Sequence, residues 1–161
     1  MKVINIGGKD YTIEFTIEAS LYSECTEKVM GLMLSIADAG EKDELSAIAP
    51  SMSDIPQTTL TMFYAGLLEH HGEEGDGTVL TKKDAKKLIK QYLDEHKEDE
   101  TGNFYGLMEL MIEIMTDDDF FNQIGLKQLF QETQTEKEVK TPQDHKKKTT
   151  TTRKSTKAGE K

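Results

Sequence analysis

Cysteine is almost absent from the sequence: Cys25 is the single thiol in 161 residues, so an internal disulfide is excluded. Long hydrophobic runs are absent too. The longest, Val29 to Ile36, is interrupted by Gly31 and Ser35 and is far shorter than the ~20 residues that span a bilayer. Neither a signal peptide nor a lipidation motif is recognisable at the N-terminal end. We therefore expect a soluble protein in a reducing cytosol, without membrane association.

Basic residues are scarce outside the C-terminal segment. The chain has 20 Lys and Arg against 30 Asp and Glu, and residues 133–161 hold 9 of the basic and 4 of the acidic ones, a net charge of +5. Residues 1–132 therefore keep 11 basic and 26 acidic side chains, a net charge of −15. Because proteins bind nucleic acid through Lys and Arg that neutralise phosphates, we expect no nucleic-acid partner.

Signatures of catalysis are missing as well. We find no nucleophile–base pair, glycine-rich phosphate loop or Cys/His cluster, so we expect no enzyme, no catalytic residue and no cofactor. Asp76-Gly77 resembles part of a calcium loop, but loop positions one and twelve would fall on Gly72 and Lys83, which have no carboxylate. We expect no metal at this segment.

The stretch Glu69-His70-His71 raises the question of a different metal site. Adjacent residues of a helix point about 100° apart, so the two histidines do not converge on one ion. The same letters continue an apolar helical face that begins at Leu60, with Pro56 suited to the first turn and Gly72 to the position after the last. Histidines near a helix C-terminus also interact favourably with its dipole. We therefore expect a helix end.

Hydrophobic periodicity predicts a mainly α, α+β fold, in which an N-terminal β-hairpin packs on a bundle of about five helices. The hairpin is formed by residues 3–15, turning at Gly7-Gly8-Lys9-Asp10. Thr16 is expected to cap a long central helix that ends near Gly40. Its apolar stripe comprises Leu21, Cys25, Val29, Leu32 and Ile36.

Further helices are predicted along the rest of the chain. A short helix and a loop follow from Glu41 to Ser53, and Thr81 with Asp84 resembles a capping box that opens a later helix. Short turns end near Gln131. We expect residues 1–132 to form one domain. Residues 133–161 have very few apolar side chains and are expected to form a disordered basic tail.

Five of the eleven basic residues of the body lie on one predicted helix, from Lys82 to Lys90. A solvated helix face explains this pattern, and contact with an acidic partner, including a second copy of this acidic body, is the alternative. The run Asp117-Asp118-Asp119 has two interpretations as well. It could bind a divalent ion, or it could cap the turn that carries Phe120 and Phe121, and capping needs no further ligand.

The segment from Asn103 to Met115 is apolar around most of its predicted helix, with Glu109 and Glu113 as its polar strip. Such a helix is either buried or faces a partner, and methionine-rich faces suit varied apolar partners. As a core helix it needs no further explanation. As a binding surface, it gives these candidate partner-binding residues: Met108, Leu110, Met111, Ile114, Met115, Phe120 and Phe121.

Several blocks occur in a characteristic order: FTIEASLY, SDIPQTTLTMFYAGLLEHHG, TKKDAKKLIKQYLDEHKED and GNFYGLMELMIEIMTDDDFFNQIGL. In this order the sequence resembles the tail assembly chaperones of long-tailed bacteriophages and prophages of Gram-positive bacteria. The resemblance covers about residues 1–126. That family has no catalytic signature, so the resemblance assigns no active-site residue.

The resemblance implies a virion morphogenesis factor that acts in the host bacterial cytoplasm and is absent from the mature virion. Its partner would be the phage tape measure protein, a long helical chain that it keeps soluble while the tail tube assembles. In such families a programmed ribosomal frameshift often yields a longer product, through which the tail-tube protein would become a second partner. The alternative is a small acidic inhibitor that mimics nucleic acid and blocks a host DNA-binding protein, which the charge of −15 supports.

Overall fold

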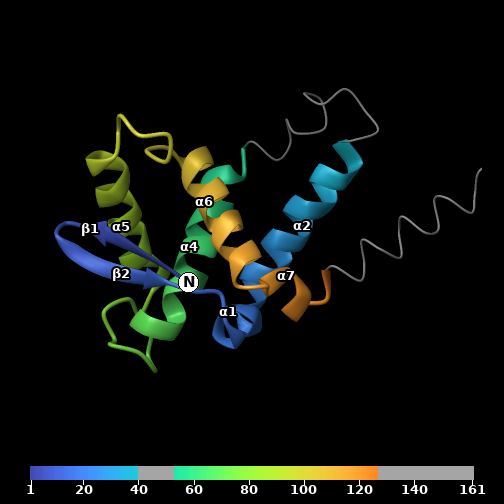
Figure 1. Ribbon diagram of the computed structural model, residues 1–161, viewed down its shortest axis with the longest axis horizontal. Helices are drawn as coiled ribbons and strands as arrows, with labels where there is room; N and C mark the ends of the chain where they lie inside the picture. The colour runs from blue at the N-terminus through green and yellow to red at the C-terminus, as the bar shows by residue number, and fades with distance from the viewer. Residues whose placement is uncertain (40–52, 127–161) are drawn as a thin grey trace, which may run out of the picture.

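The computed structural model describes residues 1–39 and 53–126. The predictions for residues 41–52 and for the C-terminal tail lie outside the described residues. Within them, two strands precede six helices along the chain (Figure 1), and the expected mainly helical fold with an N-terminal hairpin is confirmed. The elements are β1 (Lys2–Ile6), β2 (Lys9–Ile13), α1 (Ile17–Leu21), α2 (Ser23–Ala39), α4 (Ile55–His71), α5 (Lys82–Glu95), α6 (Phe104–Asp117) and α7 (Phe120–Gln123).

The hairpin turns on two residues, because Lys9 and Asp10 already belong to β2 and only Gly7 and Gly8 connect the strands. Both glycines have positive φ, 62° and 77°, which the twist of a two-residue hairpin loop requires. One face of the hairpin is buried through Ile4, Ile6, Tyr11 and Ile13.

The outer edge of β2 is closed by α4. The Thr12 N–H donates to His71 Nε2 at 2.9 Å, and two residues later the Glu14 N–H donates to the Gly66 carbonyl oxygen, also at 2.9 Å. An uncovered edge strand would expose these donors to other chains. Here one helix satisfies both, so the hairpin is joined to the bundle by its backbone as well as by its apolar face.

The central helix is α4, where the sequence suggested α2. In Figure 1, α4 runs between α2 on one side and α5 with the hairpin on the other, and α6 packs along it. Its buried residues surround the helix rather than forming one stripe: Thr58, Thr59, Thr61, Met62, Phe63, Ala65, Gly66, Leu67 and His71. Thr59 and Thr61 are buried without loss of hydrogen bonding, because their hydroxyls donate to the carbonyl oxygens four residues earlier.

The long helix expected from Thr16 to Gly40 is two helices. Tyr22, with φ −77° and ψ 90°, separates α1 from α2. As a result Leu21 is 73% exposed and leaves the expected stripe, while Cys25 and Val29 are fully buried. Thr16 precedes α1 but makes no cap hydrogen bond, because its hydroxyl donates to Glu69 at 2.7 Å.

The other predicted helix boundaries hold in most details. Thr81 and Asn103 cap α5 and α6 through their side-chain oxygens, which accept from the N–H groups of Asp84 and Gly106. Pro56 lies in the first turn of α4. Gly72 ends α4 as expected, although its φ of −75° is extended rather than left-handed.

Candidate partner-binding site

The residues proposed for partner binding on α6 are buried. Leu110 is 7% exposed and Ile114 is 1% exposed, so the expected surplus apolar face does not reach the surface. Met108, Met111, Met115 and Phe120 are buried as well, and only Phe121 is half-buried. The prediction of a contact surface on this helix is therefore wrong, because the apolar residues around α6 are packed inside the molecule.

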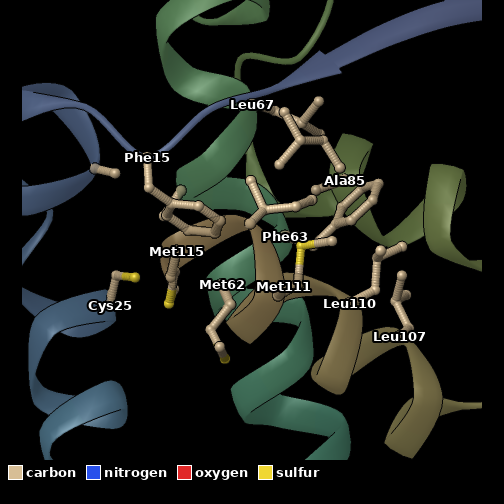
Figure 2. Packing of buried hydrophobic residues seen from close by; sticks show 14 of the residues in the cluster. Phe15, Cys25, Met62, Phe63, Leu67, Ala85, Leu107, Leu110, Met111 and Met115 are labelled. Carbon is tan, nitrogen blue, oxygen red and sulfur yellow. The ribbon is translucent and has the colours of Figure 1, made fainter. Parts of the chain in front are cut away.

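Two sets of neighbours explain this burial. One side of α6 packs along α4, and Figure 2 shows Phe63 and Met62 of α4 gathered with Met111 and Phe15 in one cluster. Beyond its C-terminal end, α7 places Phe120 against Phe15, with ring centroids 5.4 Å apart. Methionine fills the irregular space between these aromatic rings because its side chain is flexible and polarizable.

The aspartates after α6 act differently from the prediction. Asp119, at φ 55°, precedes α7 without a side-chain cap to its backbone. Asp118, whose side chain is 10% exposed, instead accepts the Phe15 N–H at 2.8 Å and contacts the Met1 amino group. It thereby anchors the segment that follows the hairpin. Sequence reasoning missed this role because the two partners are 103 residues apart.

An apolar groove of about 820 Å³ lies beside α5. Leu60 of α4, Leu93 of α5 and Phe104 of α6 line it and are half-buried, and Ile89 is buried beneath them. Its volume falls within the ~300–1,000 Å³ typical of ligand sites. The groove therefore offers apolar surface from three helices at one accessible place, which the α6 core does not.

Lysines border this groove. Lys83, Lys86, Lys87 and Lys90 are exposed and line it along α5. Lys87 pairs with Asp84 at 2.9 Å, within the same helix. The other three make no ion pair with any residue in the described ranges, 1–39 and 53–126. Within the described parts of the chain, three of the four lysines that border this apolar floor therefore have no acidic partner.

The fifth lysine of this helix is internal to the fold. Lys82 contacts the Glu24 carboxylate of α2 and donates to the Thr61 hydroxyl of α4 at 3.0 Å. The hydrogen bond from Lys82, followed by that from the Tyr22 hydroxyl, lowers the pKa of Glu24. Burial raises the pKa of the Cys25 thiol to about 12, with a smaller contribution from the Glu24 carboxylate and against the opposing effect of the Lys82 cation, so this cysteine stays protonated. The network fixes the start of α5 against α2 and α4.

The two histidines at the end of α4 contact different groups. His71 Nε2 accepts the Thr12 N–H, so the proton of its neutral ring lies on Nδ1, 3.0 Å from Asp76 Oδ2. The hydroxyl and amide of Thr78, together with His71, lower the pKa of Asp76 to about 2. His70 Nε2 lies 2.6 Å from Glu14 Oε2, nearer the surface. Among the residues that the structure describes, no three His, Cys, Asp or Glu side chains are grouped to hold a metal ion.

Replacing His71 with alanine should lower the free energy of unfolding by about 2 kcal/mol, because the Thr12 N–H loses its acceptor and a buried ring is removed. His70→Ala is the matched control. It removes only a partly exposed pair and should cost less than about 1 kcal/mol. Urea denaturation measures both values. Equal losses for the two variants would contradict the assigned role of His71.

In the described parts of the chain, 1–39 and 53–126, no helix is both long and apolar enough to cross a bilayer. Comparisons with protein-family models, with curated proteins and with solved structures give no match to this chain.

Proposed function

We propose that the protein is a non-enzymatic bacteriophage tail assembly chaperone that binds a tape measure protein in the host cytoplasm and promotes tail-tube assembly without entering the virion. The sequence resemblance over residues 1–126 suggests this role. The observation that carries the proposal is the groove beside α5: it brings apolar surface from three helices together at one place, whereas the exposed large apolar residues of the rest of the described body are scattered.

The groove suits the problem that a tape measure chain poses. A long amphipathic helix exposes apolar stripes until the tail tube encloses it, and such a helix binds by laying its apolar side into a complementary groove. Covering the stripes removes large exposed apolar patches, which promote aggregation. The net charge of −15 on residues 1–132 then keeps the complex soluble through mutual repulsion.

The lysine border weighs against the alternative of a nucleic-acid mimic. A mimic needs a continuous array of carboxylates, and Lys83, Lys86 and Lys90 interrupt the acidic surface at one of its most accessible places. A pull-down from an infected host separates the two functions. The chaperone retains a long helical tail protein, whereas a mimic would retain a host DNA-binding enzyme.

Co-expression tests the proposal directly. The protein should move a tape measure fragment encoded beside it from the insoluble to the soluble fraction and co-elute with it. The double variant Leu60→Ser/Leu93→Ser should remain folded by circular dichroism and lose most of this effect, because both side chains line the groove. An insoluble fragment in the presence of the unaltered protein contradicts the proposed function.

The matched control is Val3→Ser/Leu34→Ser, which removes two exposed apolar side chains from the hairpin and from α2, away from the groove. This variant should solubilise the fragment as well as the unaltered protein does. Loss of activity in the control alone would place the contact on another surface.

A further inference from the structure

Lys83, Lys86 and Lys90 of α5, which have no ion-pair partner within residues 1–39 and 53–126, indicate the charge of the groove's partner, which the apolar floor alone does not. We propose that the groove selects an amphipathic helix of about three turns that carries Asp or Glu beside its apolar stripe. The inference rests on the proposed function for the identity of the natural partner, but it concerns a chemical class that is testable on its own.

The dimensions of the groove set the length of the occupant. Its lining extends along α5 from Lys83 to Asp94, eleven residue steps or about 16 Å at 1.5 Å per step. With a pitch of 5.4 Å, a helix lying alongside presents about three turns to this length. Three turns of a helix supply three to four stripe residues, enough to contact the apolar floor that Leu60, Leu93 and Phe104 form.

The spacing of the lysines sets the charge pattern. Lys83, Lys86 and Lys90 are three and four residues apart, so they lie along one side of α5 and border the groove from Lys83 to Lys90, short of its end at Asp94. A bound helix with carboxylates at the same three- and four-residue spacing would place one beside each cation. Cations bordering the stripe of the bound helix would meet these lysines with like charge.

Two other occupants fit less well. Residues 133–161 of the same chain carry +5, so their charge opposes the lysine border. A second copy would need an exposed apolar helix of three turns, yet within the described ranges the helix that exposes two large apolar residues, Ile17 and Leu21, is α1, which spans five residues. Charge therefore argues against the tail, and the lack of a long exposed apolar helix in the described ranges argues against a second copy, so a different, acidic helical protein fits best.

Two synthetic peptides test this selectivity without any phage protein. Both are about 14 residues long, near the length at which helices become stable, and share one leucine stripe. One carries Glu beside the stripe and the other carries Lys. The Glu peptide should bind about tenfold more tightly, or by about 1.4 kcal/mol, which is the sum that three exposed ion pairs supply. The preference should shrink as salt rises from about 0.05 to 0.5 M.

The variant K83E/K86E/K90E should reverse the preference and bind the Lys peptide more tightly. The matched control is K2E/K9E/K97E, which changes the net charge equally at exposed lysines outside the groove and should keep the preference for Glu. Fluorescence anisotropy gives the affinities, and circular dichroism confirms that both variants are folded.

Equal binding of the two peptides, or equal responses of the two variants, overturns the inference. The inference would also be overturned if the preference for the Glu peptide appeared only after deletion of residues 133–161, because the tail would then be the occupant of the groove. Concentration-dependent dimerisation abolished by K83E/K86E/K90E would assign the groove to a second copy. Failure of the tape measure experiment with peptide selectivity intact would contradict the proposed function alone.

Discussion

The double variant Leu110→Ser/Ile114→Ser should fail to fold. Both side chains are buried, on a helix packed along α4, and they lie one turn apart. Truncating a buried Leu or Ile costs about 2–5 kcal/mol each, and the serine hydroxyls add the cost of burying polar groups. Even with partial overlap between the two cavities, the loss approaches the ~5–15 kcal/mol that stabilises an ordinary domain.

Circular dichroism and thermal melting measure this outcome. The control is Glu109→Ser/Glu113→Ser, which alters the exposed strip of the same helix and should change the free energy of unfolding by less than about 1 kcal/mol. A native-like melting transition in the Leu110 and Ile114 variant would show that these side chains are not core, and would restore α6 as a binding surface.

Replacing Gly66 with alanine should destabilise the protein by about 2 kcal/mol, although alanine is the better helix former. A Cβ at this position would lie 2.6 Å from Ile13 Cγ2 and 3.2 Å from Phe15 Cζ, both in fully packed side chains. Overpacking of this kind costs about 1–3 kcal/mol. Moving the hairpin away would also stretch the hydrogen bond from the Glu14 N–H to the Gly66 oxygen.

Gly31 of α2 is the matched control for this substitution. It too lies within a helix, but a Cβ there would meet nothing within 4 Å. Gly31→Ala should therefore raise the free energy of unfolding by up to about 1 kcal/mol through helix propensity. Chemical denaturation of both variants measures the difference. If both substitutions stabilise the protein, the close approach of the hairpin to α4 is incorrect.

Features that depend on neighbouring residues were predicted well. The hairpin follows from strand alternation around two glycines, the start of α5 follows from the cap at Thr81, and α6 begins one residue after its predicted start at Asn103, which caps it. These signals are local because each cap hydrogen bond spans only three residues. The end of α4 at His71 was predicted for the same reason.

Features that depend on residues distant in the sequence were not predicted. The pattern of α6 favoured burial but left partner contact as an alternative, and the packing of α4 and α7 against it shows that it is buried. The break at Tyr22 interrupts a periodicity that runs through both helices, and the Tyr22 hydroxyl bonds to Glu24 within a network that includes Lys82. No sequence pattern brings that lysine to Glu24, 58 residues earlier.

Only the lysines of the groove could be predicted from the sequence. The lysine row is readable from the spacing on α5, and it left a solvated face and an acidic partner as alternatives. The apolar floor comes from Leu60 and Phe104, which belong to two other helices and have no periodic relation to the lysines. The lysine face of α5 borders an apolar groove only because α4 and α6 pack beside it.

The sealing of the β2 edge by α4 also has a consequence for synthesis on the ribosome. The acceptor of the Thr12 N–H is His71, which is polymerised 59 residues later. At a translation rate of about 5–20 residues per second, His71 is synthesised roughly 3–12 s after Thr12. A two-stranded hairpin alone is only marginally stable in water. The two strands leave the ribosome before the described helices, yet they are among the last parts of the described body to become fixed. A pause in translation before His71 prolongs the time during which their edge is open.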